Sequence, residues 1–205
     1  QGVAVDSSGD VYVSDDGNDR IQKFTSDGKF ITTWGSNGRG DGQFSRPEGV
    51  AVDSSGNVYV ADYNNDRIQK FTSDGKFITT WGSNGSGDGQ FSAPQGVAVD
   101  SSGNVYVANV DNERIQKSTS DGKFITTWGS SGSGEGQFSG PGGVAVDSSG
   151  NVYVSEFIID RIQVFRQPAS EGNLTNKIMV TASNQTGNPV QEALKNAFSN
   201  ITENK

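Results

Sequence analysis

Residues 49–62 read G-V-A-V-D-S-S-G-N-V-Y-V-A-D, and close variants of this stretch begin at residues 2, 96 and 143. The spacing between these starts is 47 residues throughout. The copies at 2–48 and 49–95 differ at seven positions, the copy at 96–142 is complete, and the copy from 143 loses the pattern after Phe165. A repeat this regular decides the fold, because every unit must adopt the same local structure and bury its faces against its neighbours.

Each unit is predicted to form four short β-strands. In the first copy the strands cover residues 3–5, 11–13, 20–24 and 30–34, which are rich in Val, Ile and Phe. The intervening D-S-S-G and T-S-D-G turns suit hairpins in which the glycine takes the left-handed conformation. Even spacing without helices predicts antiparallel meanders repeated around an axis. The fold class is therefore all-β, a β-propeller of four-stranded antiparallel blades with the last blade incomplete.

The unit resembles the NHL repeat. The motifs that carry the resemblance are G-V-A-V-D-S-S-G-N-V-Y-V-A-D, N-D-R-I-Q-K-F and F-I-T-T-W-G-S-N-G-S-G-D-G-Q-F-S, with a proline two positions later. They divide residues 1–166 into blades at 2–48, 49–95, 96–142 and 143–166 and leave a C-terminal tail at 167–205. The resemblance implies a propeller, commonly of six blades. Three arrangements stay open: further blades upstream, a ring closed at four, or several cooperating chains.

The sequence contains no histidine and no cysteine, and its net charge is −8. These absences exclude His-based catalytic triads, thiol nucleophiles and zinc–thiolate sites. An acidic surface disfavours phosphate backbones, and no apolar stretch reaches the roughly 18 residues that a membrane span requires. We therefore expect no catalytic residues, no metal, no cofactor, no nucleic-acid partner and no membrane span.

Most differences between the copies gather at one end of the blades, in the loop between the second and third strands and in the connection to the next blade. In folds that display loops, the variable face is the candidate for binding, although neutral drift after duplication gives the same pattern. Phe157, Ile158 and Ile159 form an apolar run typical of a contact surface. The predicted binding face comprises Asp16, Arg39, Arg46, Tyr63, Val110, Phe157, Ile158 and Ile159.

Residues that recur in every complete copy are interpreted as structural. The D-S-S-G turn offers one carboxylate, Asp53 in the second copy, which favours a capped turn over a calcium loop. The acid–arginine pair Asp66-Arg67 is interpreted as a clamp between blades, and Trp81 as a packing residue. Ser118 replaces the Phe that stands at 24, 71 and 165, so the third copy is expected to pack less well.

The tail at 167–205 departs from the repeat. Residues 177–183 have strand character, and Asn188-Pro189 is predicted to start a helix over 189–201 with one apolar stripe. We expect the strand to complete a blade and the helix to pack on the fourth repeat, in the same chain or a neighbouring one. N-glycosylation triplets favour a secreted or cell-surface protein and begin at Asn84, Asn173, Asn184 and Asn200.

Together these features favour a non-enzymatic extracellular structural or protein-interaction scaffold. Its expected partners are proteins, foremost copies of itself, assembled into an oligomer or a fibre. The alternative is a fragment of a six-bladed ligand-binding or sensor propeller. A propeller lyase or hydrolase is the third hypothesis, and it is disfavoured because the enzymes that resemble NHL proteins depend on histidine and bound metal.

Overall fold

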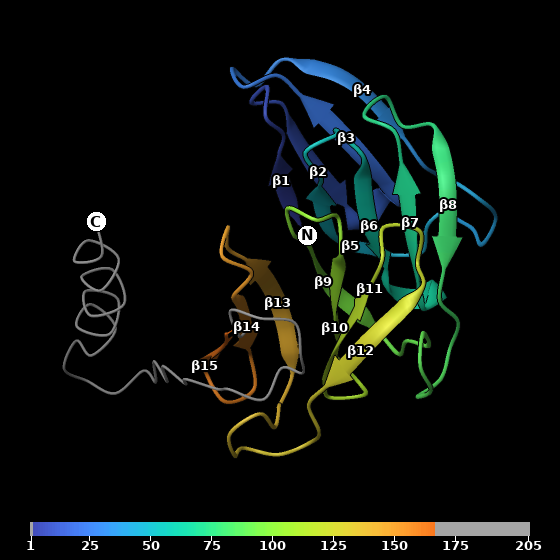
Figure 1. Ribbon diagram of the computed structural model, residues 1–205. Coiled ribbons are helices and arrows are strands. Elements are labelled where there is room, and N and C mark those ends of the chain that lie inside the picture. Colours follow the sequence, from blue (N-terminus) through green and yellow to red (C-terminus); the bar gives the residue numbers. More distant parts are fainter. Residues whose placement is uncertain (1, 167–205) are drawn as a thin grey trace, which may run out of the picture.

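The computed structural model describes residues 2–166, which form three four-stranded antiparallel sheets and one three-stranded sheet (Figure 1). Each sheet is a meander in which neighbouring strands follow one another in the chain. The strands are β1 (Val3–Val5), β2 (Val11–Asp15), β3 (Arg20–Phe24) and β4 (Phe30–Trp34) in blade 1; β5 (Pro47–Val52), β6 (Val58–Asp62), β7 (Arg67–Phe71) and β8 (Phe77–Trp81) in blade 2; β9 (Pro94–Val99), β10 (Val105–Asn109), β11 (Arg114–Ser118) and β12 (Phe124–Trp128) in blade 3; and β13 (Pro141–Val146), β14 (Val152–Glu156) and β15 (Arg161–Phe165) in blade 4.

The predicted architecture of repeated propeller blades is confirmed, including a fourth sheet whose described strands stop at Phe165. The strand and helix expected at 177–183 and 189–201 lie outside the described residues. Within residues 2–166, no helix is long and apolar enough to cross a membrane.

The inner strands of blades 2 to 4 begin earlier than the repeat pattern predicted. β5, β9 and β13 start at Pro47, Pro94 and Pro141, and a register irregularity interrupts each pairing with the next strand. A proline is tolerated at the first residue of a strand, and a bulge absorbs the extra residue. The second strand of each blade also runs two residues further than predicted, and the 3₁₀ turns η1 (Asp16–Asn18) and η2 (Tyr63–Asn65) follow it in blades 1 and 2.

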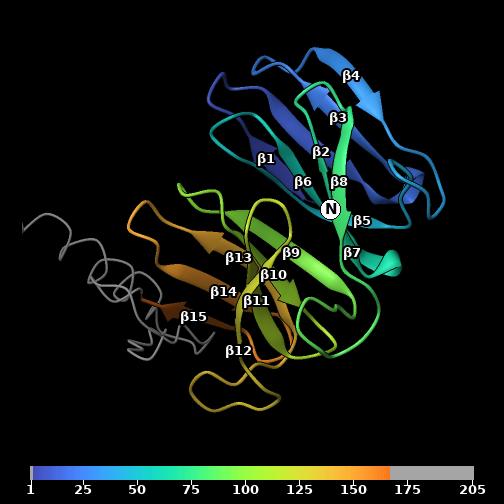
Figure 2. The same cartoon turned by 45° about the vertical axis from the view of Figure 1, so that its right-hand side comes forward.

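Consecutive blades pack face to face, as Figure 2 shows, and an apolar cluster fills each of the three spaces between them. Between blades 1 and 2, Tyr12 and Ile21 share a cluster with Val58, Val60 and Phe71. The equivalent residues form the clusters between blades 2 and 3 and between blades 3 and 4. Each blade thus has a front face, which points to the next blade in the chain, and a rear face, which points to the preceding one.

Glycine allows the inner strands to approach one another closely. A Cβ atom on Gly49 would lie 2.4 Å from the carbonyl oxygen of Gln95, and one on Gly96 would lie 2.4 Å from that of Gly142. Because these neighbours are backbone atoms, no side-chain rotation relieves the clash. The glycines that open the first three repeats are therefore required by the packing of one inner strand against the next.

The turn aspartates act as caps, as predicted. The Oδ1 atom of Asp53 accepts hydrogen bonds from the backbone N–H groups of Ser55 and Asn57, and its Oδ2 atom accepts from the side chains of Asn57 and Tyr59. Burial alone would raise the pKa of Asp53, but these hydrogen bonds outweigh burial and hold the pKa below its ordinary value. Burial and the nearby carboxylate raise the pKa of Tyr59.

Candidate functional site

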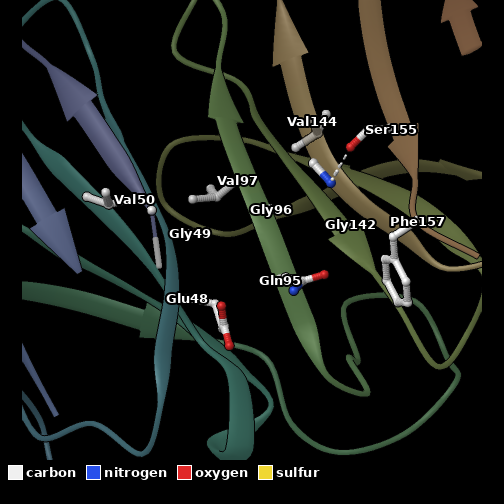
Figure 3. A pocket seen from close by; sticks show the side chains of 12 residues that line it. Glu48, Gly49, Val50, Gln95, Gly96, Val97, Gly142, Val144, Ser155 and Phe157 are labelled. Atoms are coloured by element: carbon white, nitrogen blue, oxygen red, sulfur yellow. Dashed lines mark hydrogen bonds between the residues drawn. The ribbon is translucent and has the colours of Figure 1, made fainter. Parts of the chain in front are cut away.

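The inner strands border an open pocket of about 510 Å³ at the axis of the blades (Figure 3). Much of its wall is backbone of the glycine-containing inner strands. Glu48 of β5 and Gln95 of β9 contribute polar side chains, and Phe157 lies beyond Gln95 as seen from Glu48. The pocket therefore combines a carboxylate, an amide, the Ser155 hydroxyl and an aromatic ring.

Arg46 and Tyr63 lie together beside this pocket. The Arg46 guanidinium carbon is 4.7 Å from the centre of the Tyr63 ring, and Arg46 Nε is 2.8 Å from Glu48 Oε1. The Glu48 side chain is almost buried, whereas half of the Arg46 side chain is exposed. Arg46 adopts a left-handed backbone conformation with φ of 56°, which turns the chain into β5. The arginine thus offers one exposed flank to a ligand while it neutralises the carboxylate beneath.

Blades 3 and 4 repeat this arrangement with other side chains. Val110 N–H donates to the Ala93 carbonyl at 3.3 Å, and Phe157 N–H donates to the Gly140 carbonyl at 3.0 Å. The Phe157 and Ile158 side chains lie over Gly140, where a Cβ atom would meet both, and they remain 58% and 60% exposed. We call the surface formed at these equivalent positions the loop-end face; its residues are Arg46, Tyr63, Val110, Phe157 and Ile158.

The other residues predicted for the binding face occupy separate loops. Asp16 begins η1 in blade 1, and Arg39 lies in the connection between blades 1 and 2. Ile159 is more buried than its two apolar neighbours. The exposed Asn84 donates a side-chain hydrogen bond to Asp66 at 2.9 Å. The remaining glycosylation candidates, Asn173, Asn184 and Asn200, lie outside the described residues.

The predicted arginine clamp is present, but its acidic partner differs from the adjacent residue in the sequence. Arg67 pairs with Asp62 at 2.8 Å, and the Asp62 side chain is completely buried. The Asp66 carboxylate instead accepts hydrogen bonds from the Ala93 N–H and from Asn84, both at 2.9 Å. The Arg67 guanidinium also donates to three backbone carbonyls of the preceding connection, at Arg39, Gly40 and Gln43. These bonds fix the connection that carries Arg46.

Among residues 2–166, no group of three acidic side chains is arranged to hold a metal ion. The pocket lining contributes the Glu48 carboxylate, which is already paired with Arg46. General acid–base catalysis by two carboxylates needs a second group in a different environment. The lining suits recognition by hydrogen bonds and apolar contact.

Comparison with known proteins agrees with the blade geometry. A model of the NHL repeat matches residues 1–24, 44–71 and 91–117. The chain therefore contains NHL repeats. The three matched segments cover parts of NHL blades 1, 2 and 3. No curated protein sequence matches the chain.

Solved structures resemble the NHL blades in fold. A streptogramin B lyase aligns with a TM-score of 0.63 and 20% identity over 88% of this chain and 53% of the lyase chain. A catalytically inactive virginiamycin B lyase from Staphylococcus aureus with quinupristin aligns with a TM-score of 0.63 and 20% identity. This alignment covers 91% of this chain and 56% of the lyase chain. A protein of unknown function from Bacteroides caccae aligns with a TM-score of 0.62 and 14% identity, over 89% of this chain and 60% of that protein's chain. The NHL-repeat chain thus spans little more than half the length of these proteins and shares their fold.

Sequence reasoning missed Glu48, Gln95 and Ser155 as residues of the pocket. Positions 48, 95 and 142 are equivalent in the repeat and carry Glu, Gln and Gly. The sequence therefore showed that the residue at this position varies between repeats. Their convergence follows from stacking of the inner strands, which places residues 47 apart on neighbouring strands of one wall. That placement is a property of the assembled NHL blades; the repeat spacing marks these positions as equivalent but does not place them around one space.

Proposed function

We propose that this NHL-repeat chain is a non-enzymatic extracellular scaffold that binds proteins through its loop-end face and associates with copies of itself. The observation that carries the proposal is the pair Phe157 and Ile158: both are more than half exposed, and Phe157 also lines the pocket that holds Glu48. Exposed apolar side chains rimmed by polar groups are typical of protein-binding surfaces.

The chemistry of the loop-end face favours a peptide segment with an apolar side chain. Phe157 and Ile158 provide the apolar contact. The Arg46 guanidinium stacked on the Tyr63 ring provides a second contact, which is both cationic and aromatic. Aromatic residues and arginine are enriched among the side chains that dominate binding energy at protein interfaces.

The non-enzymatic part of the proposal is supported by the residue types present. The sequence contains no histidine, whereas the solved virginiamycin B lyase was made inactive by replacing a histidine with alanine. Extracellular location is supported by the glycosylation triplets, of which Asn84 lies on the described surface. A mass increase at these asparagines after production in glycosylating cells tests that location.

A ligand-binding or sensor propeller is the second candidate, favoured by the pocket itself. Its volume of about 510 Å³ falls within the range of small-molecule sites, and Glu48 and Gln95 supply acceptors and a donor. Replacing Gln95 with leucine would abolish binding of such a polar ligand and leave peptide binding to Phe157 and Ile158 unchanged.

Selection from a displayed peptide library tests the scaffold function. Binders selected on the full chain should lose at least about tenfold in affinity when Phe157 and Ile158 are both replaced by aspartate. The matched control replaces Ile78 and Ile125, which are exposed on outer strands at 43% and 44%, with aspartate and should bind normally. Binders that ignore the Phe157–Ile158 substitutions, or turnover of a lyase or hydrolase substrate, would contradict the proposal.

A further inference from the structure

The three internal blade contacts define how one blade recognises the next. On the front face of blade 2, Tyr59 and Ile68 are fully buried, and Ala51 is 9% exposed. They share an apolar cluster with Val97, Val105 and Val107 on the rear face of blade 3. A front face that presents Ala, Tyr and Ile is therefore covered by a rear face that presents valines.

The same positions are exposed at the two ends of the series. On the front face of blade 4, Tyr153 is 38% exposed, Ile162 is 44% exposed and Ala145 is exposed. On the rear face of blade 1, Val3 and Val5 are 66% and 60% exposed. Their counterparts in the middle of the series are buried or partly buried, which shows that no described blade covers either end.

The uncovered faces are complementary by sequence. Ala145, Tyr153 and Ile162 are the same residue types as Ala4, Tyr12 and Ile21, the blade 1 residues that pack on blade 2. The rear face of blade 1 in turn carries the valines and the phenylalanine that stand on the rear face of blade 2. Contact between a blade 4 front and a blade 1 rear would reproduce the strand-to-strand contacts of the blade 1–2 interface. The described part of blade 4 lacks the fourth strand, which in blade 1 carries Trp34.

A polar contact follows the same template. Ser14 Oγ accepts from the Gly2 N–H and donates to the Glu48 carbonyl of the next blade. Ser155 is the equivalent residue in blade 4, and its Oγ accepts from the Gly143 N–H at 3.0 Å. In blades 2 and 3 this position is Ala61 and Ala108. The Ser155 hydroxyl hydrogen is thus available to a carbonyl of a following inner strand.

The backbone of β13 is open to the same close approach. A Cβ atom on Gly143 would meet only the Ser155 side chain within 4 Å, whereas those on Gly49 and Gly96 would clash with the next inner strand. A recess of about 270 Å³ lies on this side of blade 4, lined by Gly143, Val144, Ala145, Tyr153, Ser155 and Ile162. Its mainly apolar lining suits the valines of a rear face.

We propose that the front face of blade 4 binds the rear face of blade 1 of a second copy of this chain. The inference rests on the self-association in the proposed function and specifies the surfaces that meet; it does not involve the loop-end face. Two copies joined reciprocally bring together eight blades, within the range of about four to eight that propellers commonly have. A head-to-tail contact of this kind closes into a ring when its rotation allows.

Sedimentation equilibrium of the full chain tests the pairing. The expected mass is twice the 21.6 kDa of one chain. Ile162→Asp on the front face and Val5→Asp on the rear face should each weaken dimerisation by about 100-fold, because each buries an unpaired carboxylate in the contact. Ile125→Asp, at the same 44% exposure as Ile162 but on an outer strand, should remain dimeric. Circular dichroism of all three variants should give the wild-type β-sheet spectrum.

The outcomes separate this inference from the proposed function. A wild-type chain that stays at 21.6 kDa overturns the pairing and self-association together, while peptide binding at the loop-end face is measured independently. A dimer that survives both Ile162→Asp and Val5→Asp overturns the assigned faces and leaves self-association standing. A larger assembly that both substitutions abolish supports the faces and overturns closure by two copies.

Discussion

The contact between blades 1 and 2 and the contact between blades 2 and 3 share one backbone but differ in packing. In the first, Phe71 is fully buried, with its ring centre 5.9 Å from Trp34 and 5.6 Å from Phe44. In the second, Ser118 takes the position of Phe71, is 6% exposed, and its hydroxyl has no hydrogen-bond partner. The registers are nonetheless equivalent, with Phe71 opposite Phe77 and Ser118 opposite Phe124. The repeat pattern therefore fixes the strand pairing, and the aromatic cluster adds stability to it.

A second difference affects the arginine clamps of the same two blades. Asp62 pairs with Arg67 in blade 2, whereas Asn109 stands at the equivalent position in blade 3. The buried Arg114 Nε consequently has no hydrogen-bond partner, and burial lowers the pKa of Arg114. Blade 3 thus departs from its neighbours at both an apolar and a charged contact.

The largest expected effect comes from making the first contact resemble the second. Phe71→Ser should lower the free energy of unfolding by about 3–5 kcal/mol, because it removes a fully buried ring and leaves an unfilled space. Urea denaturation measures the change. Phe24→Ser alters the same repeat position on the partly exposed rear face of blade 1 and should cost much less. Equal losses in the two variants would show that the contact between blades contributes nothing specific.

The converse substitution should strengthen the second contact. Ser118→Phe should raise the free energy of unfolding by about 2 kcal/mol, since Trp81, Phe91 and Phe124 already occupy the positions that surround Phe71 in the first contact. Ser118→Ala is the matched control, which removes the unpartnered hydroxyl without adding a ring. A destabilised Ser118→Phe protein in urea denaturation would mean that the two contacts are not equivalent in shape.

Restoring the missing carboxylate should have a smaller effect. Asn109→Asp gives Arg114 an acidic partner in the geometry of Asp62 and Arg67, and we expect a gain of about 1–1.5 kcal/mol at neutral pH. Asp111→Asn, in the neighbouring exposed loop, serves as the control. The gain should disappear in an Asn109→Asp/Arg114→Gln double variant, and its persistence there would rule out the ion pair as its source.

The capped D-S-S-G turns occur in both blades compared above, and substitutions there are expected to change the free energy of unfolding least. The pKa of Asp53 is held below its ordinary value, so its stabilising contribution is complete above about pH 5 and declines as the pH falls through the ordinary value and below it. Asp53→Asn should cost about 1 kcal/mol at pH 7 and make the loss of stability in acid less steep. Asp41→Asn, an exposed acid, should leave the acid profile measured by denaturation unchanged.

The sequence was sufficient to predict the blades, because each strand, turn and glycine recurs at 47-residue spacing and each blade must bury its faces against its neighbours. The weaker packing at Ser118 was also predicted, from the Phe that stands in the other repeats. The partner of Arg67 was not: Asp66 is adjacent in the chain, but its left-handed conformation with φ of 53° directs it to the next connection. Pairing across a hairpin brings Asp62 opposite Arg67 instead.

The pocket was beyond sequence reasoning for a related reason. Glu48 and Gln95 are 47 residues apart, and their proximity depends on how closely the inner strands stack. The repeat indicated which positions are equivalent without indicating that these positions face a shared space. Binding-face residues chosen from variability alone consequently included Arg46 and Tyr63, which do meet, and Arg39, whose backbone carbonyl serves the Arg67 clamp.

The interchangeable faces of the blades have a consequence for the folding pathway. The front face of blade 2 ends in Trp81, and the rear face of blade 4 carries Phe165, which packs 5.7 Å from the equivalent Trp128 in the native arrangement. A folding chain that loops out blade 3 can place Phe165 against Trp81, an aromatic contact that native Ser118 does not provide. Such an intermediate must separate before blade 3 can enter, as in the misassembly characteristic of repeat proteins. We therefore expect refolding to become faster when residue 118 carries an aromatic ring, because Trp81 then has a native aromatic partner.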